Sequence, residues 1–284
     1  MTVKSTSAAT ALRHPPSVLT LLLARPVPVV MGILNVTPDS FSDGGKFLSP
    51  EAAVEQAKRM IAEGADILDI GAESTRPYGA APVTTDVEMQ RLRPILPDLV
   101  ALGVPVSIDT MKASVAAWAL DVGAAIVNDV WGLQRDADMA KVIAKRNVPV
   151  IVMHNRDSVD ASLDIMKDIA AFFARSLDIA AKAGIEKANI VLDPGIGFGK
   201  TPEQSMTALA RLSELQTFGL PLLVGASRKR FISNVTPSEP SGRLGGSIAA
   251  HLLAAQGGAR IIRAHDVAET VQALQVAAAI GNQR

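Results

Sequence analysis

Short apolar runs alternate along this chain with longer segments of helical spacing. The runs are rich in Val, Ile and Leu, and we expect them to form strands: Val29–Leu34, Ile67–Gly71, Val104–Ile108, Ala124–Val127, Val148–Val152, Ile190–Leu192, Pro221–Val224 and Arg260–Ile262. The segments between them are expected to be helices: Pro50–Glu63, Val87–Leu102, Ala113–Asp121, Asp164–Ala183, Pro202–Gln216, Leu244–Gln256 and Ala268–Ile280. Gly or Asn often ends a helical segment, as at Gly64, Asn147 and Gly184, which is the residue preference of helix C-termini.

Strands that alternate with helices predict a parallel sheet covered by helices. Eight such units match the length of a (β/α)8 barrel, the TIM-barrel fold, and no linker rich in Pro, Gly or Ser divides the chain. We therefore predict one barrel domain over residues 17–284, behind a flexible N-terminal extension at residues 1–16. An open, doubly wound sheet is the alternative, but such a sheet usually has a Gly-rich turn after its first strand. Here the long polar segment Asn35–Gly45 follows instead.

Composition excludes several classes of protein. The 28 basic and 28 acidic residues give zero formal charge, which argues against binding to nucleic acid. The absence of Cys excludes disulfides, thiolate metal sites and cysteine nucleophiles, and it permits a reducing compartment. No uncharged apolar stretch reaches about 18 residues, so no membrane span is expected. The run Val18–Ala24 only faintly resembles a signal peptide, because Arg25 and two prolines follow it at once.

Polar residues follow the predicted strands, where the chain leaves each one. Among them are Asn35, Glu73, Thr75, Asp109, Asn128, Asp129, His154, Asn155, Asp193, Ser227, Arg263, His265 and Asp266. In a barrel all strand C-termini lie at one face, where active sites are built, so these side chains are expected to converge. A purely local role in a turn or a helix cap is an equal alternative for Asn155, Asp129 and Asp266.

The charges differ from strand to strand. Basic residues follow the seventh and eighth strands, where barrel enzymes often hold phosphate: Arg228, Lys229, Arg230, Arg263 and His265. Asp109, Asn128 and Asp193 follow the third, fourth and sixth strands. Two carboxylates and an amide suit a heterocycle that has both N–H donors and acceptors, and a guanidine-like edge pairs with a carboxylate through two bonds. The pattern predicts an enzyme for a phosphorylated, amide-rich heterocycle; glycoside chemistry is the weaker alternative, because no nucleophile motif accompanies the carboxylates.

A glycine-rich segment, Gly195–Thr201, resembles a nucleotide-binding loop without matching one. A Walker A loop needs four residues between its first Gly and the Gly-Lys-Thr end, and Gly195 leaves three. We expect the glycines to let the backbone approach a flat ligand. The four histidines show no metal-ligand spacing, and His251 is expected to be packed inside a helix. Asn35 beside diphosphate oxygens is the candidate ligand of Mg²⁺, which needs few protein oxygens.

The longest motifs resemble those of one enzyme family. Met31–Gly45 resembles the first signature of the dihydropteroate synthase family, and Asp69–Pro77 resembles its second. The segments at residues 107–110, 128–130, 193–200, 225–229 and 263–267 resemble the remaining motifs in the family's order. Ala72, Met111 and Trp131 depart from the commonest family forms, but none of them removes a functional side chain.

The resemblance implies a reaction and a set of site residues. It implies a barrel transferase that joins 7,8-dihydropterin-6-ylmethyl diphosphate to 4-aminobenzoate, giving 7,8-dihydropteroate and diphosphate in folate biosynthesis. The residues that look like pterin readers are Asp109, Asn128, Asp193 and Lys229. Those that look like diphosphate handlers are Asn35 (with Mg²⁺), Thr75, Arg263 and His265. Those similar to residues near the aminobenzoate are Phe41, Arg76, Pro77, Phe198 and Ser227.

This chemistry needs electrostatic positioning rather than a covalent enzyme intermediate. The aromatic amine is a weak nucleophile, so loss of the C–O bond should run ahead of attack while a cationic pterin methylene develops. The catalytic residues expected on this view are Asp109, Lys229, Arg263 and His265. The resemblance further implies a cytoplasmic homodimer, a sulfonamide target, and small-molecule substrates rather than nucleic acid or membrane.

Two other functions compete with this interpretation. A methyltetrahydrofolate-binding methyltransferase shares the pterin-binding barrel, but it has no diphosphate to hold. The basic residues after the last two strands and the Thr37–Phe41 loop therefore argue against it. A non-enzymatic pterin-binding relative is the second competitor, and no loss of a motif supports it.

Overall fold

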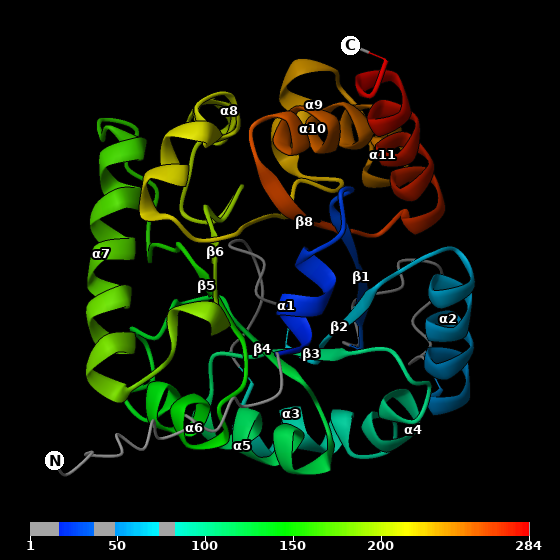
Figure 1. Ribbon diagram of the computed structural model, residues 1–284, viewed down its shortest axis with the longest axis vertical. Coiled ribbons are helices and arrows are strands. Elements are labelled where there is room, and N and C mark those ends of the chain that lie inside the picture. The colour runs from blue at the N-terminus through cyan, green and yellow to red at the C-terminus, as the bar shows by residue number, and fades with distance from the viewer. Residues whose placement is uncertain (1–16, 37–48, 74–82, 284) are drawn as a thin grey trace, which may run out of the picture.

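Eight parallel strands close into a barrel in which β1 pairs with both β2 and β8 (Figure 1). The structure is a computed structural model that describes residues 17–36, 49–73 and 83–283. The strands are β1 (Val29–Asn35), β2 (Ile67–Gly71), β3 (Val106–Asp109), β4 (Ile126–Asp129), β5 (Val150–Met153), β6 (Ile190–Asp193), β7 (Leu222–Val224) and β8 (Ala259–Ala264). The predicted fold class is therefore confirmed.

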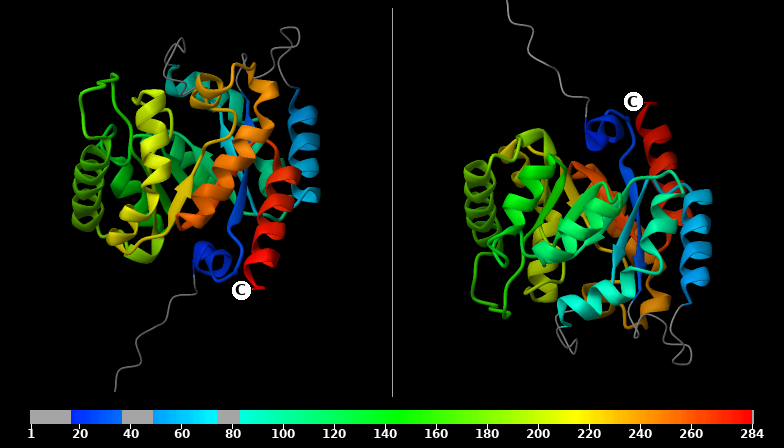
Figure 2. Two further views of the ribbon diagram at one scale, coloured as in Figure 1. Left: turned by 90° about the horizontal axis from the view of Figure 1, so that it is seen from above. Right: turned by 90° about the horizontal axis from the view of Figure 1, so that it is seen from below.

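Helices cover the outside of the barrel, as the two side views show (Figure 2). The α-helices are α1 (Val18–Leu23), α2 (Pro50–Ala62), α3 (Thr85–Leu92), α4 (Leu96–Val100), α5 (Ala113–Val122), α6 (Met139–Arg146), α7 (Ile165–Ala183), α8 (Pro202–Ala210), α9 (Arg230–Val235), α10 (Leu244–Gln256) and α11 (Val267–Gly281). Short 3₁₀ helices are η1 (Lys187–Asn189), η2 (Leu212–Phe218) and η3 (Pro240–Gly242).

The helix ends follow from local side chains. Asp164 begins α7 by accepting hydrogen bonds from the Met166 and Lys167 amides, and Gly184 ends it in the left-handed conformation. Thr201 and Gln204 form a reciprocal capping box at the start of α8. These caps fix where the loops after β5 and β6 stop and the outer helices begin.

The barrel interior has an apolar layer that α1 closes from below. Its members are Leu19, Val29, Met31, Ile67, Ile126, Ile151, Val191, Leu223 and Ile261, and they are buried together. Leu19 comes from α1, which lies across the middle of the barrel in Figure 1. The Arg260 guanidinium of β8 donates to the Leu23 carbonyl at 2.8 Å and so ties α1 to the last strand. Side chains two residues further along the strands form the layer above.

Several elements differ from the prediction. The helix expected at Val87–Leu102 is two helices, α3 and α4, because Pro94 lies between them and cannot donate a helical hydrogen bond. The helix expected at Pro202–Gln216 ends at Ala210 and continues as 3₁₀ turns. The helices α1, α6 and α9 were not predicted. The extension at residues 1–16 lies outside the described residues, so its boundary with the barrel domain stays a prediction.

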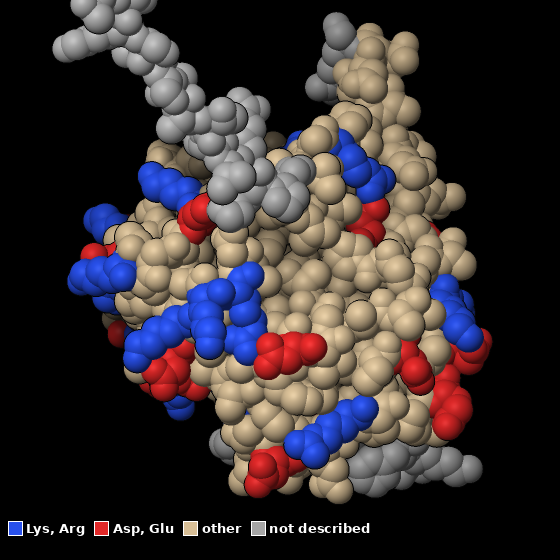
Figure 3. Space-filling view, turned by 60° about the horizontal axis from the view of Figure 1, so that its bottom comes forward, with Lys and Arg blue, Asp and Glu red and all other residues tan. Residues whose placement is uncertain are grey.

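The outer surface mixes charges of both signs. On the face that Figure 1 shows at the bottom, basic and acidic side chains lie beside one another (Figure 3). Exposed ion pairs also involve residues of α6: Arg146 contacts Asp121 at 2.8 Å, and Lys141 contacts Asp138 at 2.8 Å. Within the described part of the chain, no helix is long and apolar enough to cross a membrane.

Candidate active site

Four strands carry charged or amide side chains into the upper layer of the barrel. Asp69 of β2, Asp109 of β3, Asn128 of β4 and Asp193 of β6 are each less than 10% exposed. Strand register brings two of them side by side, because Asp109 pairs with Asn128 across β3 and β4. The structure thus brings Asp109 and Asn128 together, and Asp193 lies at the same end of the barrel, as the last residue of β6.

Arg263 of β8 joins two of these carboxylates across the mouth of the barrel. Its Nε donates to Asp69 Oδ2 at 2.6 Å, and its Nη2 donates to Asp109 Oδ2 at 2.9 Å. The Asn128 amide also donates to Asp69 Oδ2, at 3.1 Å. Asp69 therefore orients both Arg263 and Asn128. Sequence reasoning missed Asp69 as a site residue, although an aspartate in the middle of an apolar strand was the available signal.

Several acceptor atoms of this layer are buried and lack a partner. Among the described residues, Asp69 Oδ1, Asp109 Oδ1 and Asn128 Oδ1 have no hydrogen bond. Buried polar atoms in native proteins are nearly always satisfied, so such a group of acceptors indicates the place of a ligand. The ligand that would satisfy them carries N–H donors along one edge.

Burial also shifts the acidity of the two predicted pterin carboxyls. It raises the pKa of Asp109 to about 8; Arg263 acts against this rise, while Asp69 and Glu88 add to it. It raises the pKa of Asp193 to about 6, against the hydrogen bond from the Gly195 amide and the charge of Lys229. A bound N–H edge would favour the charged carboxylate form of both groups. Strongly shifted groups in a cleft are typical of functional sites.

Lys229 and Phe198 form one wall of the site. Lys229 precedes α9, and its Nζ lies 4.1 Å from the centroid of the Phe198 ring. Phe198 lies in the loop after β6 and is half-buried. The pair offers an aromatic surface and a cation in one place, which suits a flat, carbonyl-bearing ring.

Ser227 and His265 lie at the ends of β7 and β8. His265 Nδ1 is 3.0 Å from Ser227 Oγ, and the His265 amide donates to the same oxygen. Burial, together with the positive charges of Arg263, Arg228 and Lys229, lowers the pKa of His265 to about 3. A neutral imidazole surrounded by cations indicates a position that an anion would occupy.

Two other polar strand ends, Asp129 and Asn155, have local roles, as the turn alternative predicted, whereas the Asp266 side chain makes no helix cap. Asp129 accepts hydrogen bonds from the Trp131 and Leu133 amides. Asn155 accepts from the next amide in the chain. Asp266 pairs with the Arg228 guanidinium through two hydrogen bonds, so this arginine is neutralised beside the site.

Two of the glycines after β6, Gly195 and Gly199, are required by packing of the protein itself, and the expected approach of backbone to a ligand stays a prediction for Gly197. A Cβ on Gly195 would lie 2.0 Å from the His154 carbonyl oxygen. A Cβ on Gly199 would lie 2.4 Å from the Arg156 Cβ. Both glycines have positive φ, so any other residue would be strained as well as crowded.

The remaining predicted residues divide into one that is placed and four that are not. Asn35 ends β1, and its Oδ1 is 3.4 Å from the place of a Cβ on Gly71, so it faces the end of β2. No group of three or more His, Cys, Asp or Glu residues that could hold a metal occurs in the described ranges. Phe41, Thr75, Arg76 and Pro77 lie outside the described residues.

Comparisons with known proteins show the family of this chain. The sequence profile of the family described as pterin binding enzyme matches residues 31–265. A Bacillus subtilis dihydropteroate synthase is 46% identical over 90% of this chain and 89% of its own length. The chain therefore belongs to the pterin-binding enzyme family.

Two solved structures make the relationship more specific. A Xanthomonas albilineans dihydropteroate synthase with 4-aminobenzoic acid superposes with a TM-score of 0.86 at 45% identity, covering 90% of this chain and 94% of the other. The same organism's enzyme in complex with 7,8-dihydropteroate gives 0.82 at 43% identity over 90% and 94% of the two chains. Within the family, the relatives that this chain resembles over most of its length are thus dihydropteroate synthases.

Proposed function

We propose that this chain condenses 7,8-dihydropterin-6-ylmethyl diphosphate with 4-aminobenzoate to give 7,8-dihydropteroate and diphosphate. The observation that carries the proposal is the set of buried acceptor oxygens on Asp109 and Asn128 at the barrel mouth, with the buried Asp193 at the end of β6. A pterin presents a guanidine-like edge of N–H groups that would satisfy such acceptors. The enzyme is a transferase of folate biosynthesis.

Two carboxylates, an amide and a cation bind the pterin. Asp109, Asn128 and Asp193 accept its N–H groups, and Lys229 donates to an acceptor on the ring. Phe198, in contact with Lys229, supplies an aromatic surface. Arg263 is already paired with Asp109 through its Nη2, so its charge is shared between the pterin side and the leaving group.

Catalysis stabilises opposite charges as they separate. The bond between the pterin methylene carbon and the diphosphate oxygen breaks, and the bond from that carbon to the amine nitrogen forms. The nitrogen then loses a proton to the released diphosphate or to solvent. Asp109 favours the cationic pterin, while Arg263 and His265 favour the anionic leaving group. Ser227 and the residues Phe41, Thr75, Arg76 and Pro77 are proposed to contact the benzoate or the diphosphate.

Magnesium is the proposed cofactor, and Asn35 is its proposed protein ligand. A neutral amide oxygen at the rim of the barrel, without an acidic cage among the described residues, fits an ion that keeps its waters and takes substrate oxygens. When bound, Mg²⁺ would offset the charge of the diphosphate.

We also propose a cytoplasmic homodimer. Supporting this, Leu253 of α10 and the two residues Val276 and Ile280 of α11 are more than half exposed, and these two helices pack against each other. Exposed apolar patches on adjacent elements commonly mark subunit contacts. A chain without Cys suits a reducing compartment. Sulfonamides, as aryl amines, are proposed to compete with 4-aminobenzoate.

Release of diphosphate from the two substrates tests the reaction. The purified chain with Mg²⁺ should release diphosphate and form 7,8-dihydropteroate only when both substrates are present. Tight pterin binding without any release would instead favour a non-enzymatic pterin-binding protein. Transfer of a methyl group from methyltetrahydrofolate, with no use of the diphosphate, would favour the methyltransferase alternative.

A further inference from the structure

A buried lysine outside the residues proposed to read the substrate anchors the loop after β6. Lys200 is 4% exposed and directly precedes Thr201, the capping residue of α8. Its Nζ lies 2.6 Å from His154 Nδ1, 2.8 Å from the Gly195 carbonyl oxygen and 3.0 Å from the Phe198 carbonyl oxygen. The three N–H donors of an ammonium group match these three acceptors.

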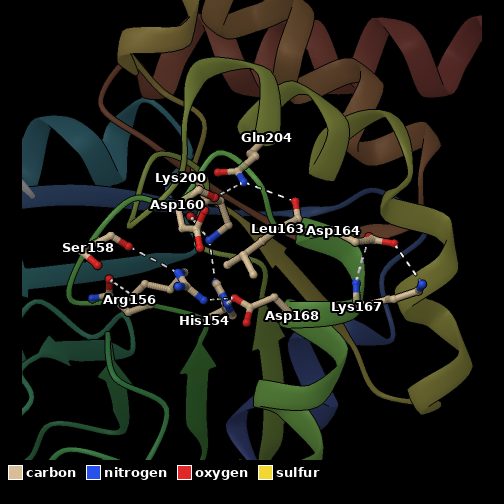
Figure 4. A network of polar contacts seen from close by, with 12 residues as sticks. His154, Arg156, Ser158, Asp160, Leu163, Asp164, Lys167, Asp168, Lys200 and Gln204 are labelled. Atoms are coloured by element: carbon tan, nitrogen blue, oxygen red, sulfur yellow. Dashed lines mark hydrogen bonds and ion pairs between the residues drawn. The ribbon is translucent and has the colours of Figure 1, made fainter.

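The lysine is held from below by a chain of polar contacts, which Figure 4 shows. His154 Nδ1 accepts from Lys200, so its proton lies on Nε2, which donates to Asp168 Oδ2 at 3.0 Å. The Arg156 guanidinium donates to the same carboxylate oxygen at 2.8 Å. Burial and the nearby Lys200 charge lower the pKa of His154 to about 3, which keeps the ring neutral.

The loop that Lys200 holds leads directly to the proposed pterin residues. The Gly195 amide donates to Asp193 Oδ1 at 2.7 Å, and the Phe198 ring faces the Lys229 ammonium. Lys200 binds the carbonyls of these same two loop residues. Displacement of the loop would therefore misplace Asp193 and Lys229 together.

Burying the Lys200 ammonium group costs desolvation free energy, so its presence calls for a functional reason. Burial lowers its pKa to about 7, while the charges of Asp193 and Asp168 oppose that shift. Buried ionisable groups with such displaced pKa values are typical of functional sites. An apolar residue of similar length would pack there without the desolvation cost but could not bind the two carbonyls.

We propose that Lys200, seated on His154 and Asp168, is a positioning residue that fixes the loop after β6 so that Asp193 and Lys229 read the pterin. It does not touch the substrate. The inference rests on the proposed pterin-transfer function and adds a residue to it.

The test compares K200M with the matched control K182M. Lys182 is an exposed residue of α7 that pairs with Asp178. Calorimetry with a phosphate-free pterin analogue should show binding roughly 10–100-fold weaker for K200M, because small displacements of positioned groups have effects of this size. Affinity for Mg²⁺-diphosphate should stay within about twofold, since Arg263 and His265 lie on other strands. K182M should match the wild type in both.

A second pair of variants covers the case in which K200M does not fold. H154L keeps the lysine but removes its acceptor and its link to Asp168, so pterin binding should weaken. H154Q restores an acceptor for Lys200 and a donor for Asp168 and should recover most of the affinity.

The outcomes separate this proposal from the function on which it rests. A wild-type chain that binds no pterin overturns both. A wild-type chain that binds pterin, with K200M or H154L folded and equal to it, overturns the positioning role alone. An equal loss of pterin and diphosphate affinity would also overturn it, because that result would indicate general damage to the fold.

Discussion

Two layers of side chains inside the same barrel come from the same strands and differ in chemistry. Ile67 lies in the apolar layer and Asp69, two residues later on β2, lies in the polar one. On β6, Val191 and Asp193 are related in the same way. The spacing of two follows from the alternation of side chains along a strand, so one strand supplies both a packed floor and a reactive surface.

The two layers differ in whether their side chains find all their partners within the protein. The apolar layer is complete in the protein alone, because its members contact one another and Leu19 closes it. The polar layer has buried oxygens without partners among the described residues, and burial raises the pKa of Asp109 and Asp193. We therefore expect substitutions in the apolar layer to reduce the stability of the fold and substitutions in the polar layer to reduce binding of the pterin.

The largest expected effect on binding comes from Asp193→Asn. The amide cannot accept a pair of N–H groups with a full negative charge, so pterin affinity should fall by about 2–5 kcal/mol. Thermal stability should not fall, because burial already disfavours the charged form of Asp193. Calorimetry with a pterin analogue and a melting curve check the two parts.

Asp129→Asn is the matched control. Asp129 is equally buried, and burial raises its pKa to about 6 as well, but its oxygens bind the amides of a turn. This variant should leave pterin affinity unchanged. If Asp129→Asn and Asp193→Asn weakened pterin binding equally, the special role of the polar layer would be refuted.

Ile151→Ala tests the lower layer. Its side chain is fully buried in the apolar cluster, so truncation should lower the free energy of unfolding by about 3 kcal/mol through lost burial and a cavity. Denaturant unfolding measures this loss. Pterin affinity, measured well below the unfolding transition, should match the wild type; a parallel loss of affinity would show that the layers are not independent.

His265→Ala tests the division within the polar layer. Removing a donor to a charged diphosphate should cost about 1.5–3 kcal/mol of diphosphate affinity. Binding of a phosphate-free pterin should not change, since the imidazole contacts Ser227 on the β7 side of the site. A weaker phosphate-free pterin complex would place His265 in the pterin pocket instead.

The pH dependence of pterin binding should report Asp193. Burial raises the pKa of Asp193 to about 6, and the carboxylate is the form that accepts the N–H pair. Asp109 also binds as a carboxylate, and burial raises its pKa to about 8, so affinity should begin to fall below about pH 8. Below about pH 6 the protonation of Asp193 should add a further tenfold loss, or about 1.4 kcal/mol, for each unit. In Asp193→Asn this added slope should be absent, and if it survived the substitution it would belong to another group.

The smallest expected effect concerns the metal. Asn35→Ala removes one neutral ligand among waters and substrate oxygens, so the Mg²⁺ concentration for half-maximal turnover should rise roughly fivefold, equivalent to about 1 kcal/mol. A titration of Mg²⁺ against turnover measures it. Full activity of the wild type in a chelator would remove Mg²⁺ from the proposal.

The sequence predicted those parts of the fold that depend on periodicity. Buried parallel strands are continuous apolar runs, and polar residues end or follow them, so β6 and Asp193 could be located together. The break between α3 and α4 at Pro94 could not be predicted from the spacing of apolar residues, because that spacing continues on both sides of the break. The short α6 was missed because its eight residues span only about two turns, which is too short to show a helical period.

Contacts between distant residues explain what sequence reasoning missed in the site. Asp69 is a site residue because Asn128 and Arg263 reach it from β4 and β8. Lys200 stood in a motif already rejected as a nucleotide loop, and its partner His154 lies 46 positions away in the sequence. Such roles arise from the closure of the barrel rather than from a local pattern.

The hydrogen bond between Arg260 and the Leu23 carbonyl has a consequence for the order of folding. The two residues are 237 positions apart, and β1 must pair with β8 for the barrel to close. Contacts of this range slow folding, so native structure should form only after almost the whole chain has left the ribosome. Until then β1 remains an unpaired edge that can join other chains. A nascent chain halted before Ala259 should therefore depend on chaperones to avoid aggregation, whereas a completed chain can close the barrel by pairing β1 with β8.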